Sequence, residues 1–436
     1  MMRIKYLLNN NLSKPSRLLL DTVFALILAS QFVSCASTIK QEKPVTSEED
    51  LATYFEAHGI PRCACSMPTI YFSSKEWSKR AVELINSAHD YILVTVFLAN
   101  WHEYSAPIYE ALMRKAQEGV RVYFILDPSS YSQRRNGSEQ LLPVVSQTLT
   151  KGGVHVVEYN TFSGERLPTT VNLLDRDHRK FWIVDGKYIT TGGMNINQQS
   201  LAPLDEGGHM DTLVEVQSEE VARSMIRSFC VTWNAFSPEH IDPADFPIQK
   251  MDAPETFLWL ADQGLDENGI TDAMFDAFFL YAKQEIWLVQ SYSFVTSELL
   301  DKIRAATSRG VKVNILMAKH GDMDPYDRAM GYCMEPLMKA GASIYMYEPS
   351  ERAFIHSKIV IADKNLVAFG SANFNFRSQH LSREMEFLFN DERVVQQAYD
   401  NLQGLLPDSR PVTIEEARHY RTIGNFLTYL VFLVGG

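Results

Sequence analysis

Two stretches of the sequence carry the same polar residue types at the same spacing. In the first, His178 is followed by Lys180 two positions later and by Asp185 seven positions later. Asn195 lies seventeen positions after the histidine. The second stretch repeats all of these offsets with His356, Lys358, Asp363 and Asn373. At ordinary residue frequencies, a match of four residue types in two separate copies is not expected by chance.

These residue types suit chemistry on a phosphodiester. An imidazole, an ammonium group and an amide that converge on one point form a good environment for a tetrahedral oxyanion such as phosphate. A phosphodiester is cleaved in two displacements if one imidazole attacks phosphorus and a second imidazole protonates the leaving alcohol. This two-histidine chemistry explains why the chain carries two copies of the motif. We therefore predict an enzyme that cleaves or transfers phosphodiesters.

Each motif is predicted to form a β-hairpin. The apolar runs 181–184 and 359–362 end at residues that favour tight turns. Side chains two positions apart on a strand share a face, so each motif histidine points the same way as its lysine. Two-residue turns would place His178 opposite Gly193 and His356 opposite Ser371. These small residues leave room for a ligand.

The elements around the motifs also occur twice, in the same order. A buried strand, an amphipathic helix that stops at a glycine, and two further strands precede each motif. The first set covers 91–97, 108–118, 120–126 and 154–159, and the second covers 285–290, 299–308, 311–317 and 343–347. We predict an α/β fold of two repeats around a pseudo-two-fold axis, with both motifs at the seam.

At this level of detail the sequence resembles the phospholipase D superfamily, and within it the cardiolipin synthase and phospholipase D-like branch. The resemblance rests on the two H-x-K-x4-D motifs and covers roughly residues 70 to 410. It extends to the spacing from Phe229 to Trp233 and from Arg377-Ser378 to Glu384. The family implies two phospholipase D-like α/β repeats with one active site between them.

The resemblance also implies roles for the motif residues. His178 is expected to be the nucleophile that forms a phosphohistidine, and His356 the general acid and later base, with the reverse assignment left open. The two lysines and the two asparagines would hold the nonbridging phosphate oxygens. No metal and no cofactor is expected, because these residues do not form a carboxylate cluster.

Carboxylates are needed to fix the tautomer of the catalytic imidazoles. Glu384 matches the family's partner of a motif histidine, and Asp211 is the candidate from the first half. Which carboxylate contacts which histidine stays open. Asp185 and Asp363 lie at the predicted turns, several residues from the histidines, and are interpreted as structural.

The charge of the chain bears on its substrate. The net charge is −12, which repels polyanions and argues against nucleic acid as a partner. We predict a phospholipid substrate at a membrane surface and a phospholipid phosphodiesterase or phosphatidyltransferase. An exported, metal-independent nuclease of the same superfamily is the alternative. A catalytically inactive binding scaffold is a third hypothesis, disfavoured because both motifs are intact.

The start of the chain suggests attachment to a membrane, whereas the apolar tail fits a buried element, an interfacial segment or a re-entrant piece equally well. Residues 1–35 combine a basic start with an apolar stretch and are predicted to be a signal peptide or an uncleaved anchor. Cys35 is the candidate lipid attachment site of a bacterial lipoprotein, so we expect an exported, membrane-associated protein of the cell envelope. The remaining predicted units are a tether at 36–67, the two repeats at 68–250 and 251–410, and an apolar tail at 411–436.

Overall fold

The computed structural model describes residues 45–132, 144–161, 175–321, 324–349 and 354–435. The chain divides into Met1–Pro44 and one compact unit, Val45–Gly436, and all of the described residues belong to the second unit. The predicted signal peptide or anchor and its Cys35 lie outside the described residues. Within those ranges, no helix is both long and apolar enough to cross a membrane.

In the described part of the first half, seven strands form one sheet. In spatial order they are β2 (Thr69–Tyr71), β10 (Leu213–Val216), β8 (Tyr188–Gly192), β7 (Phe181–Val184), β3 (Tyr91–Val96), β4 (Arg121–Leu126) and β5 (His155–Glu158). The three strands predicted here, β3, β4 and β5, are parallel. Strand β3 is buried along its whole length, as expected for a central strand covered on both faces.

The second half builds a matching sheet. Its main path, in the described residues, is β1 (Arg62–Cys65), β11 (Thr256–Gln263), β18 (Ser382–Phe389), β17 (Leu366–Gly370), β16 (Ile359–Ala362), β12 (Glu285–Val289), β13 (Lys312–Ala318), β14 (Ser343–Tyr347) and β19 (Ser409–Pro411). The parallel strands β12, β13 and β14 correspond to β3, β4 and β5. The predicted duplication is therefore confirmed.

Helices cover both sheets in the same order. Those of the first half are α4 (Ser74–Ser87), α5 (Ala106–Gln117), α6 (Val144–Lys151), α7 (Gln198–Leu201) and α8 (Glu219–Phe236). Those of the second are α9 (Ile270–Tyr281), α10 (Ser297–Ser308), α11 (Asp324–Lys339), α12 (Phe376–His380) and α13 (Glu392–Leu405). Short 3₁₀ turns lie at Pro128–Ser132, Leu204–Glu206, Pro243–Asp245 and Leu406–Asp408.

The helix stops predicted at two glycines are present. Gly119 follows α5 with φ +95° and Gly310 follows α10 with φ +87°. Glycine adopts this left-handed conformation without the steric cost that a Cβ would add, which is why it ends helices so often. Each glycine turns the chain from its helix into the next parallel strand.

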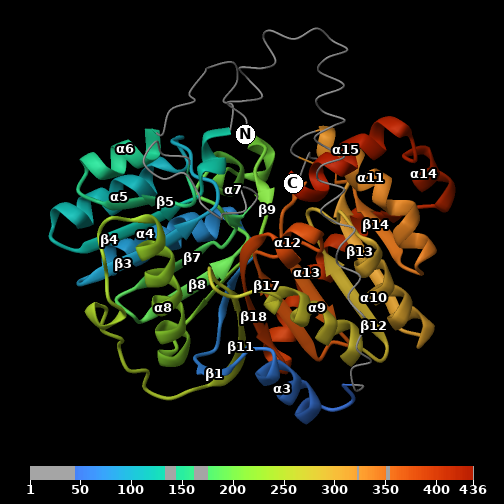
Figure 1. The fold of residues 1–436 in the computed structure, drawn as a ribbon, viewed down its shortest axis with the longest axis horizontal. Helices are drawn as coiled ribbons and strands as arrows, with labels where there is room; N and C mark the ends of the chain where they lie inside the picture. Colours follow the sequence, from blue (N-terminus) through green and yellow to red (C-terminus); the bar gives the residue numbers. More distant parts are fainter. Residues whose placement is uncertain (1–44, 133–143, 162–174, 322–323, 350–353, 436) are drawn as a thin grey trace, which may run out of the picture. The chain divides into compact units, whose positions relative to one another are not determined.

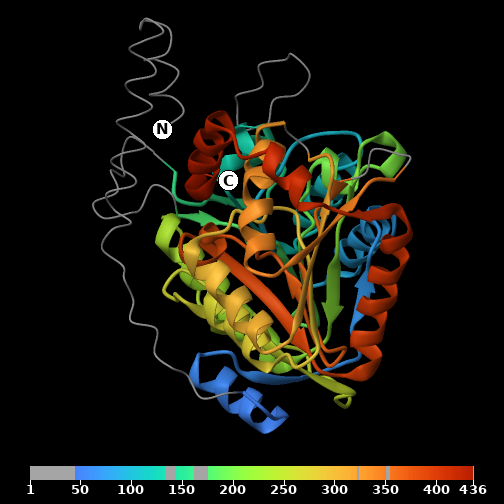
Figure 2. The same cartoon turned by 90° about the vertical axis from the view of Figure 1, so that its right-hand side faces the viewer.

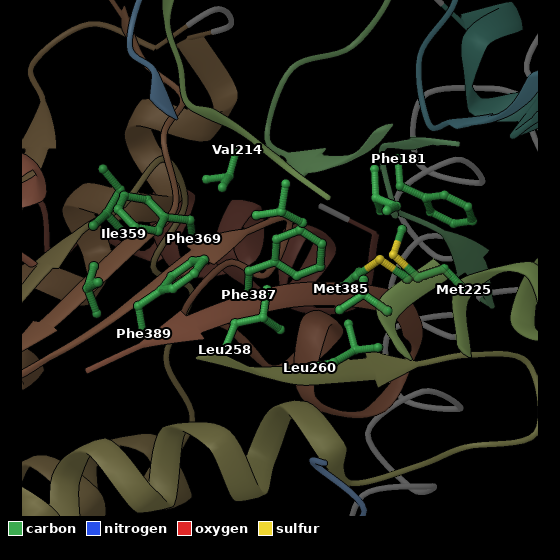
Figure 3. Packing of buried hydrophobic residues seen from close by; sticks show 14 of the residues in the cluster. Phe181, Val214, Met225, Leu258, Leu260, Ile359, Phe369, Met385, Phe387 and Phe389 are labelled. Carbon is green, nitrogen blue, oxygen red and sulfur yellow. The ribbon is translucent and has the colours of Figure 1, made fainter. Parts of the chain in front are cut away.

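The two sheets pack against each other through apolar side chains. Figure 1 shows the halves side by side, with β8, β17 and β18 between them. Phe181 and Val214 from the first sheet join one buried cluster with Phe369, Phe387 and Met385 from the second (Figure 3). This shared core fixes the position of one half relative to the other, and therefore of one motif relative to the other.

The prediction of a tether over 36–67 was wrong for the part that the structure describes. Helix α3 (Glu48–Ala57) is closed by a capping box at Ser47 and buries Leu51 and Phe55. Strand β1 then pairs with β11 of the second half. The polar residues of the segment are its solvent face, and two well-spaced apolar residues suffice to dock a short helix. The repeat boundaries, 68–250 and 251–410, stay a prediction.

The apolar tail consists of two helices, α14 (Ile414–His419) and α15 (Ile423–Gly435). Helix α15 packs on α11 and α12. Figures 1 and 2 both show it at the end of the molecule opposite α3.

Candidate active site

Two very short parallel strand pairs connect the halves beside the motifs. Strand β6 (Arg176–Asp177) pairs with the start of β18, and β15 (Phe354–Ile355) pairs with β9 (His209–Met210). In each pair, the next residue on one strand is a motif histidine and the next residue on the other is a carboxylate. The pairing thus places His178 beside Glu384 and His356 beside Asp211.

Both imidazole–carboxylate pairs are formed, and each crosses from one half to the other. The Nδ1 atom of His178 lies 3.0 and 3.1 Å from the two carboxylate oxygens of Glu384. The Nδ1 atom of His356 lies 2.6 Å from Oδ2 of Asp211. An ionised carboxylate only accepts hydrogen bonds, so Nδ1 carries the proton and Nε2 is the reactive nitrogen. The structure thus answers the open question of which carboxylate meets which histidine.

The electrostatics favour neutral imidazoles beside charged carboxylates. Burial lowers the pKa of His178 to about 3, against the pull of Glu384. Burial alone would raise the pKa of Glu384, but its pairing with His178 brings that pKa down to about 2. Burial also lowers the pKa of His356, and the pairing with His356 outweighs burial to lower the pKa of Asp211. Neutral Nε2 atoms are the form that a nucleophile needs.

The two motif lysines are buried next to the histidines. Lys180 and Lys358 each donate to the backbone carbonyl of the histidine of their own motif, and Lys358 also lies 2.8 Å from Oγ of Ser291. Burial lowers the pKa of Lys180 to about 7. A bound phosphate anion would favour the charged form of such a lysine and raise that pKa again.

The two asparagines occupy matching positions but have different contacts. Oδ1 of Asn195 accepts the backbone N–H of Leu98 at 2.9 Å. Oδ1 of Asn373 is buried and has no hydrogen-bond partner within the described residues. Both side chains are almost fully buried, with exposures of 2% and 6%. Their role in binding phosphate stays a proposal.

The motif aspartates brace the backbone away from the histidines. The carboxylate of Asp185 accepts the backbone N–H groups of three consecutive residues, 89–91. Asp363 does the same at 283–285, where β12 begins. Because each aspartate follows its strand whereas the histidine precedes it, the two lie at opposite ends of that strand. These contacts agree with the structural role predicted for both.

Both predicted hairpins exist, but their register differs from our prediction by one residue. Val184 pairs with Tyr188 and Ala362 with Leu366, so three residues rather than two separate the paired ends. The expected tight turn is present, since Lys187 N–H donates to the Val184 carbonyl at 3.0 Å. One further residue then precedes the ladder. Continuing this register sets His178 level with residue 194 instead of Gly193, and His356 level with residue 372 instead of Ser371.

The small residues nevertheless have a function at the site. A Cβ on Gly193 would lie 2.1 Å from Oδ1 of Asp211, so the glycine lets this carboxylate approach. At the equivalent position, Ser371 donates to Oε2 of Glu384 at 2.5 Å. Ser378 donates to the other oxygen of Glu384 at 2.7 Å. Both small residues therefore shape the environment of a carboxylate and do not face the histidine of their own motif.

Sequence reasoning missed two neighbours of the histidines, Phe97 and His209. The ring of Phe97 lies 4.7 Å from that of His178 and 5.1 Å from Nζ of Lys180. The ring of His209 lies 5.4 Å from that of His356. Ser378 was named only for its spacing to Glu384, and its hydrogen bond to that carboxylate was not foreseen. The spacing G-x-x-N-x-N-x-x-S occurs after both motifs, ending at Ser200 and Ser378. No sequence signal singled out Phe97 or His209.

Comparison with known proteins gives cardiolipin synthases among the relatives of this chain. Cardiolipin synthase of Geobacillus kaustophilus (strain HTA426) is 26% identical over 349 residues, which are 79% of this chain and 67% of that protein. Cardiolipin synthase A of Pseudomonas putida (strain GB-1) is 28% identical over 335 residues, with 77% and 67% covered.

Solved structures share the fold at low sequence identity. Phosphatidylserine synthase of Haemophilus influenzae Rd KW20 matches with a TM-score of 0.66 and 12% identity, over 87% of this chain and 95% of that one. The family model described as "Cardiolipin synthase, PLD-like domain" matches residues 81–233 and 277–406, more than half of the chain. Each matched segment contains one complete motif, and the two motifs meet where the halves of the fold join. The chain therefore belongs to the phospholipase D-like cardiolipin synthase family.

Proposed function

We propose that the protein is a phospholipid phosphatidyltransferase or phosphodiesterase that works through a phosphohistidine. The observation that carries the proposal is the pair of motif imidazoles, each held by a carboxylate from the opposite half. The relatives named cardiolipin synthase support a phospholipid as the substrate. The net charge of −12 supports it as well, since a nucleic acid presents many phosphates to this negative body and a phospholipid presents few.

The proposed reaction has two displacements at one phosphorus. In the first, Nε2 of His178 forms a bond to phosphorus, the bond to the leaving alkoxide breaks, and His356 donates a proton to that oxygen. In the second, His356 takes the proton of water or of an acceptor alcohol, whose oxygen bonds to phosphorus as the P–N bond breaks. This sequence restores both histidines.

The bound substrate would set the protonation states that this sequence needs. A phosphodiester carries one negative charge, which raises the pKa of the neighbouring imidazoles and of Lys180. His356 can then hold the proton that it donates, while Glu384 keeps Nδ1 of His178 protonated and its Nε2 free. The lysines and asparagines would stabilise the charge that builds up on the nonbridging oxygens.

One assay tests this function. Purified full-length protein is incubated with labelled phosphatidylglycerol, phosphatidylcholine or single-stranded DNA at equal phosphodiester concentration. We expect phospholipid to be turned over at least tenfold faster than DNA, a difference of about 1.4 kcal/mol. Added glycerol or phosphatidylglycerol distinguishes transfer from hydrolysis. DNA cleavage as fast as lipid turnover, abolished by His356→Asn, would establish a nuclease instead.

A chelation control belongs to the same assay. Exhaustive chelation should leave turnover unchanged, because lysines and asparagines occupy the proposed phosphate site. Activity that is lost and then restored by one divalent metal would contradict this assignment of the phosphate-binding residues.

For membrane attachment, we propose that residues 1–35 act as a signal peptide or anchor and that Cys35 receives a lipid. The basic start and the apolar stretch that follows it support this. In a bacterial host, Cys35→Ser should block lipid labelling and processing. If wild-type protein never incorporates labelled lipid, the uncleaved anchor is the correct alternative.

A further inference from the structure

Helix α15 exposes a continuous apolar stripe. Its thirteen residues, Ile423–Gly435, include no acidic or basic side chain. Ile423, Leu427 and Val431 are 81%, 50% and 58% exposed, and Phe426 beside them is 39% exposed. Side chains four positions apart lie on one face of a helix. Of the large hydrophobic residues that are exposed within the described chain, four of seven belong to this one helix, and such clustering indicates a contact surface.

The opposite face of α15 is firmly attached to the protein. The hydroxyl of Tyr429 donates to the backbone carbonyl of Val295 at 2.8 Å. The ring of Phe432 lies 4.2 Å from that of Tyr326 on α11, and Tyr429 lies 5.4 Å from Tyr332. The exposed stripe therefore belongs to a docked helix, and its position is fixed relative to the rest of the fold.

A series of aromatic rings connects this helix to the candidate active site. Phe432 contacts Tyr326, Tyr326 lies 4.7 Å from Tyr292, and Tyr292 lies 6.4 Å from the imidazole of His356. Tyr292 and its neighbour Phe294 lie just after β12, and both are buried. The docked face of α15 is thus three ring contacts away from one of the two histidines.

We propose that α15 lies in the interfacial region of a lipid bilayer and docks the site onto the membrane that supplies its phospholipid, an inference that rests on the proposed function. Thirteen helical residues span about 20 Å, too short for a hydrocarbon core of about 30 Å. A helix that lies in the membrane plane buries its apolar face about 5–10 Å deep. An uncharged stripe suits hydrocarbon, and a two-chain lipid reaches the histidines most directly from a bilayer beside them.

Fluorescence quenching tests the contact directly. Full-length Leu427→Trp is mixed with phosphatidylglycerol and phosphatidylcholine vesicles that carry bromine on the acyl chains. Phe257→Trp is the matched control, because Phe257 is 42% exposed but lies on β11. We expect quenching above the wild-type background only for residue 427. No extra quenching at 427, while the variant turns over the vesicle lipid, would overturn the proposal.

Activity provides an independent readout. The double variant Leu427→Glu and Val431→Glu should turn over vesicle phospholipid at least tenfold more slowly, because charge is costly in hydrocarbon. Its activity on a short-chain phospholipid dissolved as monomers should equal that of the wild type, and Phe257→Glu should retain both activities. Equal vesicle activity in all three proteins would contradict membrane docking through α15.

The same measurements separate failure of the inference from failure of the proposed function. Quenching at residue 427 without turnover of any phospholipid would support docking and disprove the proposed activity. Turnover of monomeric and vesicle lipid without quenching would support the activity and disprove docking. If residue 427 instead cross-links to a second copy or to residues 18–33 and is not quenched, protein covers the stripe and the proposal is wrong.

Discussion

The two halves of the site have the same plan but differ around their carboxylates. Glu384 accepts hydrogen bonds from two serine hydroxyls, Ser371 and Ser378, in addition to facing His178. Asp211 accepts the backbone N–H of Thr212 and fits beside Gly193, with no serine in an equivalent role among the described residues. The longer carboxylate is therefore anchored by side chains, and the shorter one by the backbone.

The surroundings of the two imidazoles differ as well. Phe97 packs against His178, whereas His356 has the rings of Phe354 and Tyr292 and a second imidazole, that of His209, near it. Exposure does not distinguish the two rings, since the side chain of His178 is 13% exposed and that of His356 is 9% exposed. A polar environment favours a group that gains and loses a proton. The second imidazole beside His356 fits its proposed role as acid and base, and the assignment of His178 as the nucleophile stays a prediction.

The largest effect is expected when either histidine is removed. His178→Asn and His356→Asn should each lower kcat by about 10⁵-fold, since residues that act as a unit fail together. In His356→Asn the adduct should form slowly and persist. Mass spectrometry after addition of substrate should then show the phosphatidyl mass on His178. A stable adduct on His356 in the reciprocal variant would reverse the roles of the two halves.

Substituting each carboxylate in turn should distinguish the roles of the two histidines, because only one of these roles depends on how much protonation the leaving group needs. Glu384→Gln and Asp211→Asn should each lower turnover of natural lipid by about 10³- to 10⁴-fold, because the imidazole loses its fixed tautomer. A nitrophenyl phosphodiester has a leaving group that needs little protonation. The burst of released nitrophenol measures how fast the adduct forms from this substrate. We expect the rate of adduct formation to return towards that of the wild type in Asp211→Asn and to stay low in Glu384→Gln. The opposite result would make His356 the nucleophile.

The buried neutral imidazole also predicts a dependence of stability on pH. His178 has a pKa near 6.5 when unfolded and about 3 when folded, so between these values the unfolded chain binds the extra proton. Stability should therefore fall as the pH falls through this window. Urea unfolding gives the free energy of unfolding at pH 6.5 and at pH 4.5. Its decrease between these two pH values should be about 2 kcal/mol smaller in His178→Asn than in the wild type. The exposed His419→Asn is the control, and an unchanged loss in His178→Asn would contradict the prediction.

The smallest effect compares two equivalent serines. Ser378→Ala removes one hydrogen bond from Glu384 and the acceptor of the Asn373 backbone N–H, whereas the hydroxyl of Ser200 has no hydrogen-bond partner in the described part of the chain. We expect about a tenfold lower kcat for Ser378→Ala, equal to about 1.4 kcal/mol, and no change for Ser200→Ala. Equal losses would show that the two serines act only through packing.

Sequence reasoning succeeded where the determinant is local. The apolar runs, the glycines after the helices and the spacing of the motifs predicted the repeated strands and both hairpins. Helix α3 was missed because its polar face dominates its composition, and only tertiary contacts reveal that Leu51 and Phe55 are core residues. The hairpin register was off by one, because the extra residue after the tight turn leaves no signal in residue type.

The partners of the histidines show the same limit. Glu384 was identified through the family resemblance and Asp211 through its position, but a sequence does not state which half each one faces. That choice depends on strand pairs only two residues long, β6 with β18 and β9 with β15. Such short pairings have no periodicity to detect, and they form only because the shared core holds the sheets together.

These two strand pairs have a consequence for the origin of the molecule. Each half supplies a histidine to one pair and a carboxylate to the other, so neither half alone builds either pair. Two identical copies of one half, related by a two-fold axis, would build both at once, as an isologous dimer does. In such a dimer every substitution occurs twice. Joining the copies in one chain removes this constraint, and it allows glutamate and aspartate, or Phe97 and His209, to specialise on opposite sides of a single phosphate.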